Sequence, residues 1–240
     1  MNILVVSAHS ADFCSRAGGT IAKHVRHGDR VKVLSLSYGE RSESGGLYAG
    51  GAKPTFAEIK AIRHEEATAA AKILGAEIAF LDWGDFCFEY SSERAKVVAQ
   101  EVRAFRPDVV LTHHGPDPVS VDHDSTYWIV KRGVGMAGAG GLESDYPPKG
   151  RTKLFLFEAT VPLTELEGFN PDFYVDITAT WETKLEALKA FSRAQETLQH
   201  WYLDVAKQRA FQAQRLAGRS DIVYAEAFER TAPSVHDLLP

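Results

Sequence analysis

The stretch Asn2-Ile3-Leu4-Val5-Val6-Ser7-Ala8-His9-Ser10-Ala11-Asp12 decides the fold, because an apolar run ends there at polar side chains. The first six of these residues, Asn2–Ser7, are typical of a short strand buried in a parallel sheet. Val109–Thr112 has the same character, and Asp122-His123-Asp124 follows it. All strand carboxyl ends lie at one edge of a parallel α/β sheet, so the residues that follow the two strands are expected to meet.

His9, Asp12 and His123 are the residues at this edge that could hold a metal ion. Two imidazoles and a carboxylate with an open fourth position form the ligand set of a catalytic zinc site. A closed structural site has four protein ligands, usually with thiolates. A lone histidine would be interpreted as an ordinary loop residue, but the combination of residue type and position predicts Zn²⁺ as a cofactor.

Apolar runs and helical patterns alternate along the chain. The predicted strands are Asn2–Ser7, Arg30–Ser37, Ala79–Leu81, Val109–Thr112, Lys153–Glu158, Phe173–Asp176 and Asp221–Phe228. The predicted helices are Thr20–His27, Thr55–Leu74, Ser92–Phe105, Ser125–Met136, Thr178–Glu196 and Trp201–Leu216. Thr55 and Glu58 have the spacing of a helix capping box, and Gly75 that of a stop signal. We predict an α/β, Rossmann-like fold, a mainly parallel β-sheet with helices on both faces, formed by one domain over residues 1–240.

Composition narrows the classes of function. The apolar fraction of 45% and the charged fraction of 25% are ordinary for a globular protein. The net charge of −5 and the absence of a long basic run argue against nucleic acid or an anionic membrane as the partner. The chain starts directly in a strand, without the regions of a signal peptide, and no apolar run reaches spanning length. Cys14 and Cys87 lack metal-type spacing, which favours a reducing compartment, so we expect a soluble cytoplasmic protein.

Two glutamates are candidates for proton transfer at the predicted metal site. Glu40 and Glu43 lie in a loop rich in Gly and Ser, residues 38–54, directly after the second predicted strand. Loops of this length are usually functional or disordered. A glutamate beside a metal centre is a natural proton carrier, whereas most loop carboxylates are simply solvated.

Further polar residues flank the same sheet edge. The guanidinium groups of Arg16 and Arg41 suit recognition of carboxylates, although pairing with Glu or Asp to hold a loop is the alternative. One of His113 and His114 is expected to point toward the site. Asp122 could accept a hydrogen bond from a metal-binding histidine and orient it.

Two motifs have competing interpretations. Gly18-Gly19 could cradle a phosphate at a helix N-terminus, but it lacks the spacing of either glycine-rich nucleotide fingerprint. We favour glycines that let a helix pack closely on the sheet. The cluster His200-Trp201-Tyr202 could form an oligomer contact or pack in the core.

These motifs resemble the LmbE/PIG-L superfamily of zinc-dependent N-deacetylases, over most of the chain. The first motif of that family reads Ala-His-Pro-Asp-Asp-Glu, where this chain has Ala8-His9-Ser10-Ala11-Asp12-Phe13. Its downstream His-Pro-Asp-His corresponds to Ser120-Val121-Asp122-His123. Its second loop and its Arg-x-x-Glu helix correspond to Gly39–Ser44 and Arg63–Gly75. The resemblance implies a Rossmann-like fold with zinc on the two histidines and the aspartate named above.

The departures from that family are informative. In the deacetylases the first Asp of the motif is the general base, and here that position is Ala11, which cannot accept a proton. The first His of the second motif is Ser120, and the Glu after the ligand Asp is Phe13. The metal ligands are retained while the hydrolytic base is lost, which argues against ordinary amide hydrolysis.

One branch of the superfamily, the 4-oxalomesaconate hydratases, combines the same changes. Its members add water to an unsaturated oxo-tricarboxylate in the bacterial breakdown of gallate and protocatechuate. The similar segments here are Val6–Phe13, Arg16–Gly19, Gly39–Ser44 and Val223–Glu226. The branch carries a histidine after the fifth strand, where this chain has Thr160.

The resemblance implies a zinc-dependent hydratase (hydro-lyase) acting on a small polycarboxylate. Zinc would polarise an oxo or enol oxygen, or present water to the double bond. Glu43, or failing that Glu40, would carry the proton. The residues expected to contact the substrate are Arg16, Arg41, His113 and Thr160. The alternatives are an N-deacetylase or amidase with a relocated base, and a metal-binding module without turnover.

Overall fold

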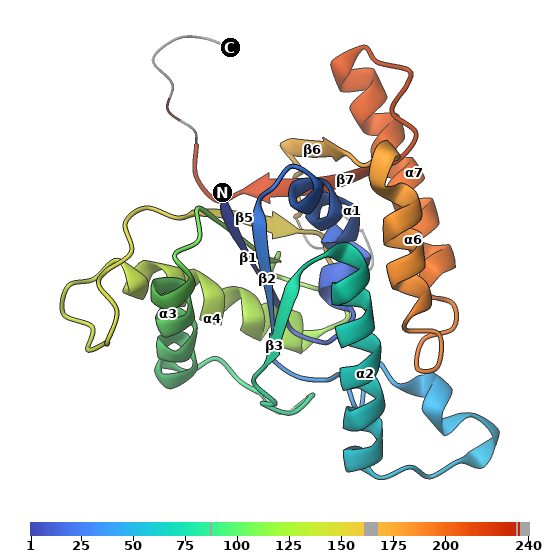
Figure 1. Ribbon diagram of the computed structural model, residues 1–240, viewed down its shortest axis with the longest axis horizontal. Coiled ribbons are helices and arrows are strands. Elements are labelled where there is room, and N and C mark those ends of the chain that lie inside the picture. Colours follow the sequence, from blue (N-terminus) through green and yellow to red (C-terminus); the bar gives the residue numbers. More distant parts are fainter. Residues whose placement is uncertain (87, 161–167, 234, 236–240) are drawn as a thin grey trace.

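Seven strands form one sheet in the order β3-β2-β1-β4-β5-β7-β6 (Figure 1). They are β1 (Asn2–Ser7), β2 (Arg30–Ser35), β3 (Glu77–Phe80), β4 (Val109–His113), β5 (Lys153–Phe157), β6 (Phe173–Asp176) and β7 (Ala225–Arg230). The first five strands are parallel, and β7 runs antiparallel to both of its neighbours. This computed structural model describes residues 1–86, 88–160, 168–233 and 235. The predicted mainly parallel α/β sheet is confirmed.

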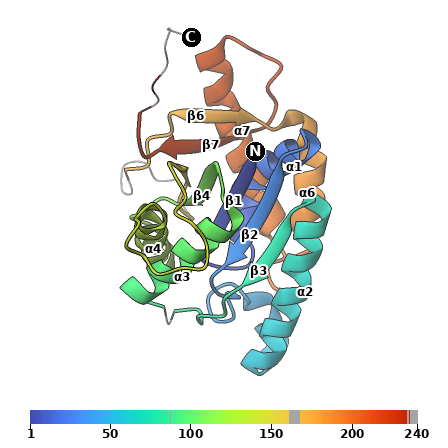
Figure 2. The same ribbon diagram turned by 60° about the vertical axis from the view of Figure 1, so that its left-hand side comes forward.

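Helices cover both faces of the sheet, as predicted (Figures 1 and 2). The helices are α1 (Asp12–Arg26), α2 (Phe56–Leu74), α3 (Ser92–Phe105), α4 (Val121–Ala137), α6 (Trp181–Lys189) and α7 (Leu198–Ala217), with short 3₁₀ turns η1 (Gly45–Gly51) and η2 (Thr178–Thr180). Helices α1, α2, α6 and α7 pack with Val5 and Val33 on one face. Helices α3 and α4 pack with Leu4 and Val6 on the other. The side chains of β1 therefore alternate between two cores, which explains why its sequence is apolar throughout.

The sheet reverses its direction of growth at β1. From β1 the chain moves outward through β2 to β3 and then returns to β4 on the other side of β1. The loops after β1 and β4 consequently leave the sheet at neighbouring positions. Such a switch point is where open α/β sheets usually bind ligands.

Helices α1 and α4 begin at least four residues earlier than predicted, and α7 begins three residues earlier, at Leu198. Helix α1 begins at Asp12 rather than Thr20, because the N–H groups of Cys14 and Ser15 both bond to the carbonyl of Ala11 and close a first turn. Helix α4 begins at Val121 rather than Ser125. The correction places Asp12, Asp122 and His123 in first helical turns rather than in loops.

Gly18 and Gly19 lie inside α1 and serve close packing, although their near neighbours are Ile177 and Lys184 rather than the face of the sheet that we expected. A Cβ atom on Gly19 would lie 2.6 Å from Cδ1 of Ile177, and one on Gly18 would lie 3.3 Å from Cγ of Lys184. These distances leave no room for a side chain at Gly19. The glycine pair thus admits the segment that precedes α6, and no phosphate cradle is needed to explain it.

The remaining boundaries differ mostly in the second half. The predicted helix Thr178–Glu196 is divided into η2, α6 and a series of turns over residues 190–197, and the last strand begins at Ala225. The capping box of α2 is confirmed, since Thr55 N–H donates to Glu58 (2.7 Å) and Glu58 N–H donates back to Thr55 Oγ1 (3.3 Å). Gly75 ends the helix with φ at 79°.

A buried ion pair from the second half of the chain is set against α1. Lys184 Nζ donates to the carbonyl of Ser15 and to Glu226, each at 2.7 Å. The carboxylate of Glu226 accepts from the backbone N–H groups of Gly19 (2.9 Å) and Thr20 (2.8 Å). Helix α1, which carries Asp12, is therefore fixed by residues of α6 and β7.

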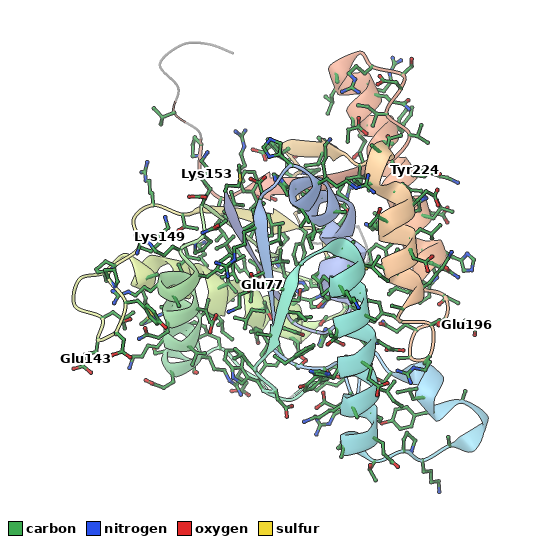
Figure 3. The ribbon with its side chains drawn as sticks, viewed as in Figure 1. Glu77, Glu143, Lys149, Lys153, Glu196 and Tyr224 are labelled. Carbon is green, nitrogen blue, oxygen red and sulfur yellow. The ribbon has the colours of Figure 1, made fainter. Side chains whose placement is uncertain are left out.

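Charged side chains cover the periphery, where Glu143 and Glu196 point outward (Figure 3). Cys14 is buried and free of any disulfide, and Cys87 lies outside the described residues. Tyr202, in the cluster for which we left two interpretations open, is buried in the core of the α1 face, while Trp201 beside it is exposed. Within the described ranges, none of the helices has the length and apolar character required to cross a bilayer.

Candidate metal centre

The predicted metal ligands come together at the switch point. His9 follows β1, Asp12 opens α1, and His123 lies in the first turn of α4. Ligand atoms of these residues and of Glu43, from the β2–α2 loop, all lie within 4.8 Å of one another. His9, Asp12 and His123 are buried, and only the Glu43 side chain is partly exposed, at 18%. The strand-end argument from the sequence correctly predicts this juxtaposition.

Two imidazole nitrogens in this cluster lie near carboxylates without forming a hydrogen bond to any described residue. His9 Nδ1 and His123 Nε2 are buried and make no hydrogen bond within the described part of the chain. His9 Nδ1 lies 3.5 Å from one oxygen of Asp12, and His123 Nε2 lies 3.6 Å from the other. Unpaired buried polar atoms are costly, so two of them facing one carboxylate fit a bound cation. The donor set of two imidazoles and a carboxylate suits zinc.

The other nitrogen of His9 faces two carboxylates. Nε2 lies 3.3 Å from Asp122 and 3.4 Å from Asp85. Both carboxylates favour the tautomer with the proton on Nε2, which leaves the lone pair of Nδ1 free for a metal. Asp122 therefore lies where it can orient a histidine, as predicted, but that histidine is His9 rather than its neighbour in sequence.

Asp117 holds His123 in the matching orientation. Its Oδ2 atom accepts from His123 Nδ1 at 2.6 Å, and the same oxygen accepts from the backbone N–H of Thr160 at 2.9 Å. The proton is thereby kept on Nδ1, and Nε2 faces Asp12. A carboxylate that orients a metal-binding histidine is a frequent feature of metal sites.

The electrostatic environment of the cluster favours a cation. Burial by itself would raise the pKa of the Asp12 carboxyl, but His113 and His123 hold that pKa well below its ordinary value. Burial, together with the neighbouring His123, lowers the pKa of His113 to about 3. Burial also opposes protonation of His9, yet the carboxylates around it, Glu43 foremost, raise its pKa well above the ordinary value. Without a metal, a proton on His9 compensates the charge of the surrounding carboxylates.

The two candidate proton carriers lie in different surroundings. One oxygen of Glu43 is 3.4 Å from His9 Nδ1, so this carboxylate belongs to the cluster. Glu40 is almost fully buried, and its Oε1 accepts from the backbone N–H of Asp85 (3.2 Å) and lies near Arg41 (3.4 Å) and Lys60 (3.8 Å). Glu40 thus lies near cations of the loop and of α2 rather than near the histidines.

Arg16 and Thr160 lie beside the cluster and contact each other. Arg16 Nη1 donates to the carbonyl of Glu158 (2.9 Å), and Nη2 donates to Thr160 Oγ1 (3.2 Å). Arg16 Nε lies 3.4 Å from Asp12. A buried guanidinium therefore neutralises part of the negative charge directly next to the proposed ligands.

Arg41 has the surroundings of the loop-holding alternative. Its Nη1 donates to the carbonyl of Asp85 at 2.6 Å, and its guanidinium lies over the ring of Phe56, 4.5 Å from the centroid. The Asp85 carboxylate in turn accepts from the backbone N–H groups of Arg41 and Ser42. These contacts organise the β2–α2 loop.

Of the two adjacent histidines, His113 is the one at the site. Its ring stacks on His123 with centroids 4.0 Å apart, and its Nε2 accepts from the backbone N–H of Ala8 at 3.0 Å. His114 packs its ring against Phe169. One histidine therefore points toward the cluster and the other away, as expected.

Two carboxylates of the site, Asp117 and Asp85, are not among the residues predicted from the sequence. Both follow strands of the same sheet edge, Asp117 after β4 in Gly115-Pro116-Asp117 and Asp85 after β3 in Trp83-Gly84-Asp85. The strand-end argument that selects His9 would have included these two carboxylates. Which histidine each one contacts depends on loop conformation, which the sequence pattern does not reveal.

A mainly parallel sheet with a histidine–aspartate–histidine cluster after β1 and β4 defines a class of α/β proteins with a candidate metal site at the switch point. Within that class, residues 4–133 match the family described as PIG-L: GlcNAc-PI de-N-acetylase, and the chain belongs to this family. The matched region contains His9, Asp12 and His123.

The similarity to hydratases of Pseudomonas putida extends over 98% or more of the chain. The 4-oxalmesaconate hydratase of Pseudomonas putida is 38% identical over 239 residues, covering 98% of this chain and 91% of that protein. The crystal structure of GalB, the 4-carboxy-2-hydroxymuconate hydratase of Pseudomonas putida, superposes with a TM-score of 0.93 at 38% identity and covers 100% of this chain and 99% of that one. A mycobacterial 1D-myo-inositol 2-acetamido-2-deoxy-alpha-D-glucopyranoside deacetylase is 29% identical over 226 residues, covering 78% of this chain and 72% of that protein.

Proposed function

We propose that this protein is a zinc-dependent hydratase (hydro-lyase) that adds water to a small unsaturated oxo-polycarboxylate of the 4-oxalomesaconate type. One observation carries the proposal. The candidate metal ligands are all present, but the residue directly before Asp12 is Ala11, a buried side chain that cannot accept a proton. Deacetylase chemistry in this family needs a carboxylate at that position. The full-length similarity to a hydratase supports the same conclusion.

In this proposal His9, Asp12 and His123 hold the zinc ion, and Asp122 and Asp117 orient the two imidazoles. When bound there, zinc would act as a Lewis acid that polarises the oxo or enol oxygen of the substrate.

Glu43 is the group that we assign to proton transfer. Hydration places a hydroxyl group on one carbon of the double bond and a proton on the other, so the site needs a group that exchanges a proton with the substrate. Glu43 is the partly exposed carboxylate of the cluster, whereas Glu40 is enclosed by the loop. Glu43 can therefore meet a bound acid and Glu40 cannot do so without a rearrangement of the loop.

Arg16 is the cation that we assign to the anionic substrate, with Thr160 and His113 beside it. The Arg16 guanidinium lies between Thr160 and Asp12, and its Nε atom has no hydrogen-bond partner within the described residues. The buried positive charge of Arg16 beside the proposed ligands attracts an anionic substrate toward the cluster. We assign Arg41 to the loop, because its contacts are with Asp85 and Phe56.

Absorbance of a conjugated substrate tests the proposal. Hydration of the enol form of oxalomesaconate removes the conjugation, so zinc-loaded protein should bleach its absorbance. Glu43→Gln should lower turnover by a factor of about 10² to 10⁴ with zinc content little changed. Glu40→Gln, the matched control in the same loop, should lose much less. Absence of bleaching across several unsaturated oxo-acids would reject the substrate class.

The deacetylase alternative is favoured by the family description and by the mycobacterial relative. It predicts release of acetate from N-acetylated sugars by the zinc-loaded protein. We expect no such release, because the position of the usual base is Ala11.

A further inference from the structure

The Glu43 carboxylate is bridged between two groups. Its Oε1 atom lies 3.4 Å from His9 Nδ1, and its Oε2 atom lies 3.5 Å from Nη2 of Arg63 on α2. The Arg63 side chain is completely buried, and it also donates to the carbonyl of Tyr38 (3.1 Å) and to Glu66 (3.0 Å). Because each oxygen of Glu43 has a different neighbour, the carboxylate is held in one orientation.

Arg63 connects this loop to a distant segment of the chain. The same Nη2 atom donates to Gln195 at 3.1 Å, within the turns at residues 190–197 between α6 and α7. Ala194, in these turns, donates its N–H to Glu66 at 3.2 Å and accepts the N–H of Gly46 at 2.9 Å. The loop that carries Glu43 is thus bound both from α2 and from the α6–α7 turns.

Gly46 shows how closely the loop is seated. A Cβ atom at this position would lie 2.4 Å from the carbonyl oxygen of Arg193 and 2.9 Å from that of Ala194. The neighbouring Gly45 would meet no atom of the described residues within 4 Å. The backbone of the loop therefore touches the turns at Gly46 with no space for a side chain.

We propose that Arg63 is a positioning residue, which together with the turns at residues 190–197 holds Glu43 beside His9 for proton transfer. The inference rests on the proposed function, since it assigns the anchor of the proton carrier of that reaction. A long loop with many glycines is intrinsically mobile, and proton transfer requires a fixed donor geometry. The buried guanidinium of Arg63 contacts the Glu43 carboxylate, a side chain of α2 and a side chain of the distant turns. These contacts supply a fixed geometry for Glu43.

Gly46→Ala tests the anchor without changing any charge. The added methyl group needs a shift of about 1 Å to reach ordinary contact with the carbonyl of Arg193, and a misplacement of this size can cost about 100-fold in rate. We expect kcat to fall by about that factor, with zinc content and KM little changed. Gly45→Ala is the matched control, because it makes the same chemical change in open space and should keep full activity.

A double-mutant cycle separates positioning from a general structural role. If the anchor acts through Glu43, Gly46→Ala should cause little further loss of kcat in a Glu43→Gln background. Equal losses in both backgrounds would overturn the inference, as would full activity of Gly46→Ala. Arg63→Lys keeps the charge but loses the several fixed donors of the guanidinium, so it should follow the same non-additive pattern. This variant replaces Gly46→Ala in the test if Gly46→Ala does not fold.

The outcomes also separate this inference from the function on which it rests. Full activity of Glu43→Gln would reject Glu43 as the proton carrier and the anchor with it. If Glu43→Gln loses its activity while Gly46→Ala and Arg63→Lys both stay fully active, the result would reject the anchor alone.

Discussion

Asp117→Asn tests how the orientation of His123 prepares the centre for a metal. Five hydrogen-bond donors share the two oxygens of Asp117. Oδ2 accepts from His123 Nδ1 (2.6 Å) and from the N–H (2.9 Å) and hydroxyl (3.2 Å) of Thr160, while Oδ1 accepts two N–H groups of the following turn. Asparagine has only one acceptor oxygen. If that oxygen remains with the turn, an NH₂ group faces His123, whose proton then moves to Nε2, the atom that would bind the metal.

The expected loss follows from the role of such a partner. Removing the group that orients a metal-binding histidine typically costs 10- to 100-fold in metal affinity, or about 1.4 to 2.7 kcal/mol. The dissociation constant of zinc, measured by competition with a chromogenic chelator, should rise by this factor. Thermal unfolding of the metal-free variant shows whether the fold persists.

Asp124→Asn provides the matched control. Asp124 accepts the N–H of Asp117 through one oxygen at 2.6 Å, and an amide oxygen can keep that bond. Unchanged zinc affinity in Asp117→Asn would refute the reasoning. An equal loss in both variants would assign the effect to the loop as a whole rather than to His123.

Three further predictions concern the site and the fold. Ala11→Asp should weaken hydration, because a new carboxylate would repel an anionic substrate. The variant should release little acetate from N-acetylated sugars, because Ser120 still stands where the deacetylases have a histidine. Bleaching and acetate assays measure the two activities, and an unimpaired hydration rate would contradict the prediction. The raised pKa of His9 means that a proton competes with the metal ion for this side chain. Zinc affinity should therefore be highest above that pKa and fall by up to about tenfold per pH unit below it. Zinc titrations between about pH 8 and about pH 6 that give one constant affinity would exclude this competition. Thr55→Ala should lower the free energy of unfolding by about 1 kcal/mol in denaturant titrations, because both hydrogen bonds of the Thr55 hydroxyl group are lost. Thr55→Ser should retain most of that stability, and equal losses in the two variants would argue against the cap.

Local pattern was sufficient to predict the bounds of several elements, including the strand β1 that precedes His9. The bounds of β1, β6 and α3 agree with the sequence prediction. The positions of His9 and His123 after two parallel strands also correctly predicted that these residues lie close together, although they are far apart in the chain. Both results depend on periodicity and on the geometry of parallel sheets, which short segments of sequence determine.

The features that were not predicted from the sequence depend on contacts between distant segments of the chain. The prediction placed the start of the first helix after Gly18 and Gly19, but both lie inside α1, where Gly19 is packed closely against Ile177. The partners of Asp117 and Arg63 are fixed by loops that fold against other elements, so their residue types alone did not indicate a role at the site. Hydrogen bonds of this kind are set by tertiary structure rather than by propensity.

The Lys184–Glu226 pair has a consequence for the order in which the protein matures during synthesis. All three proposed ligands emerge from the ribosome within the first 123 of the 240 residues, yet the N–H groups of Gly19 and Thr20 receive their carboxylate only when β7 has been made. A nascent chain that ends before Lys184 should therefore contain every ligand and still bind zinc weakly, which a chelator competition on such a truncated chain would measure. Metal loading would then be a late event in biogenesis, delayed until the last strand completes the sheet.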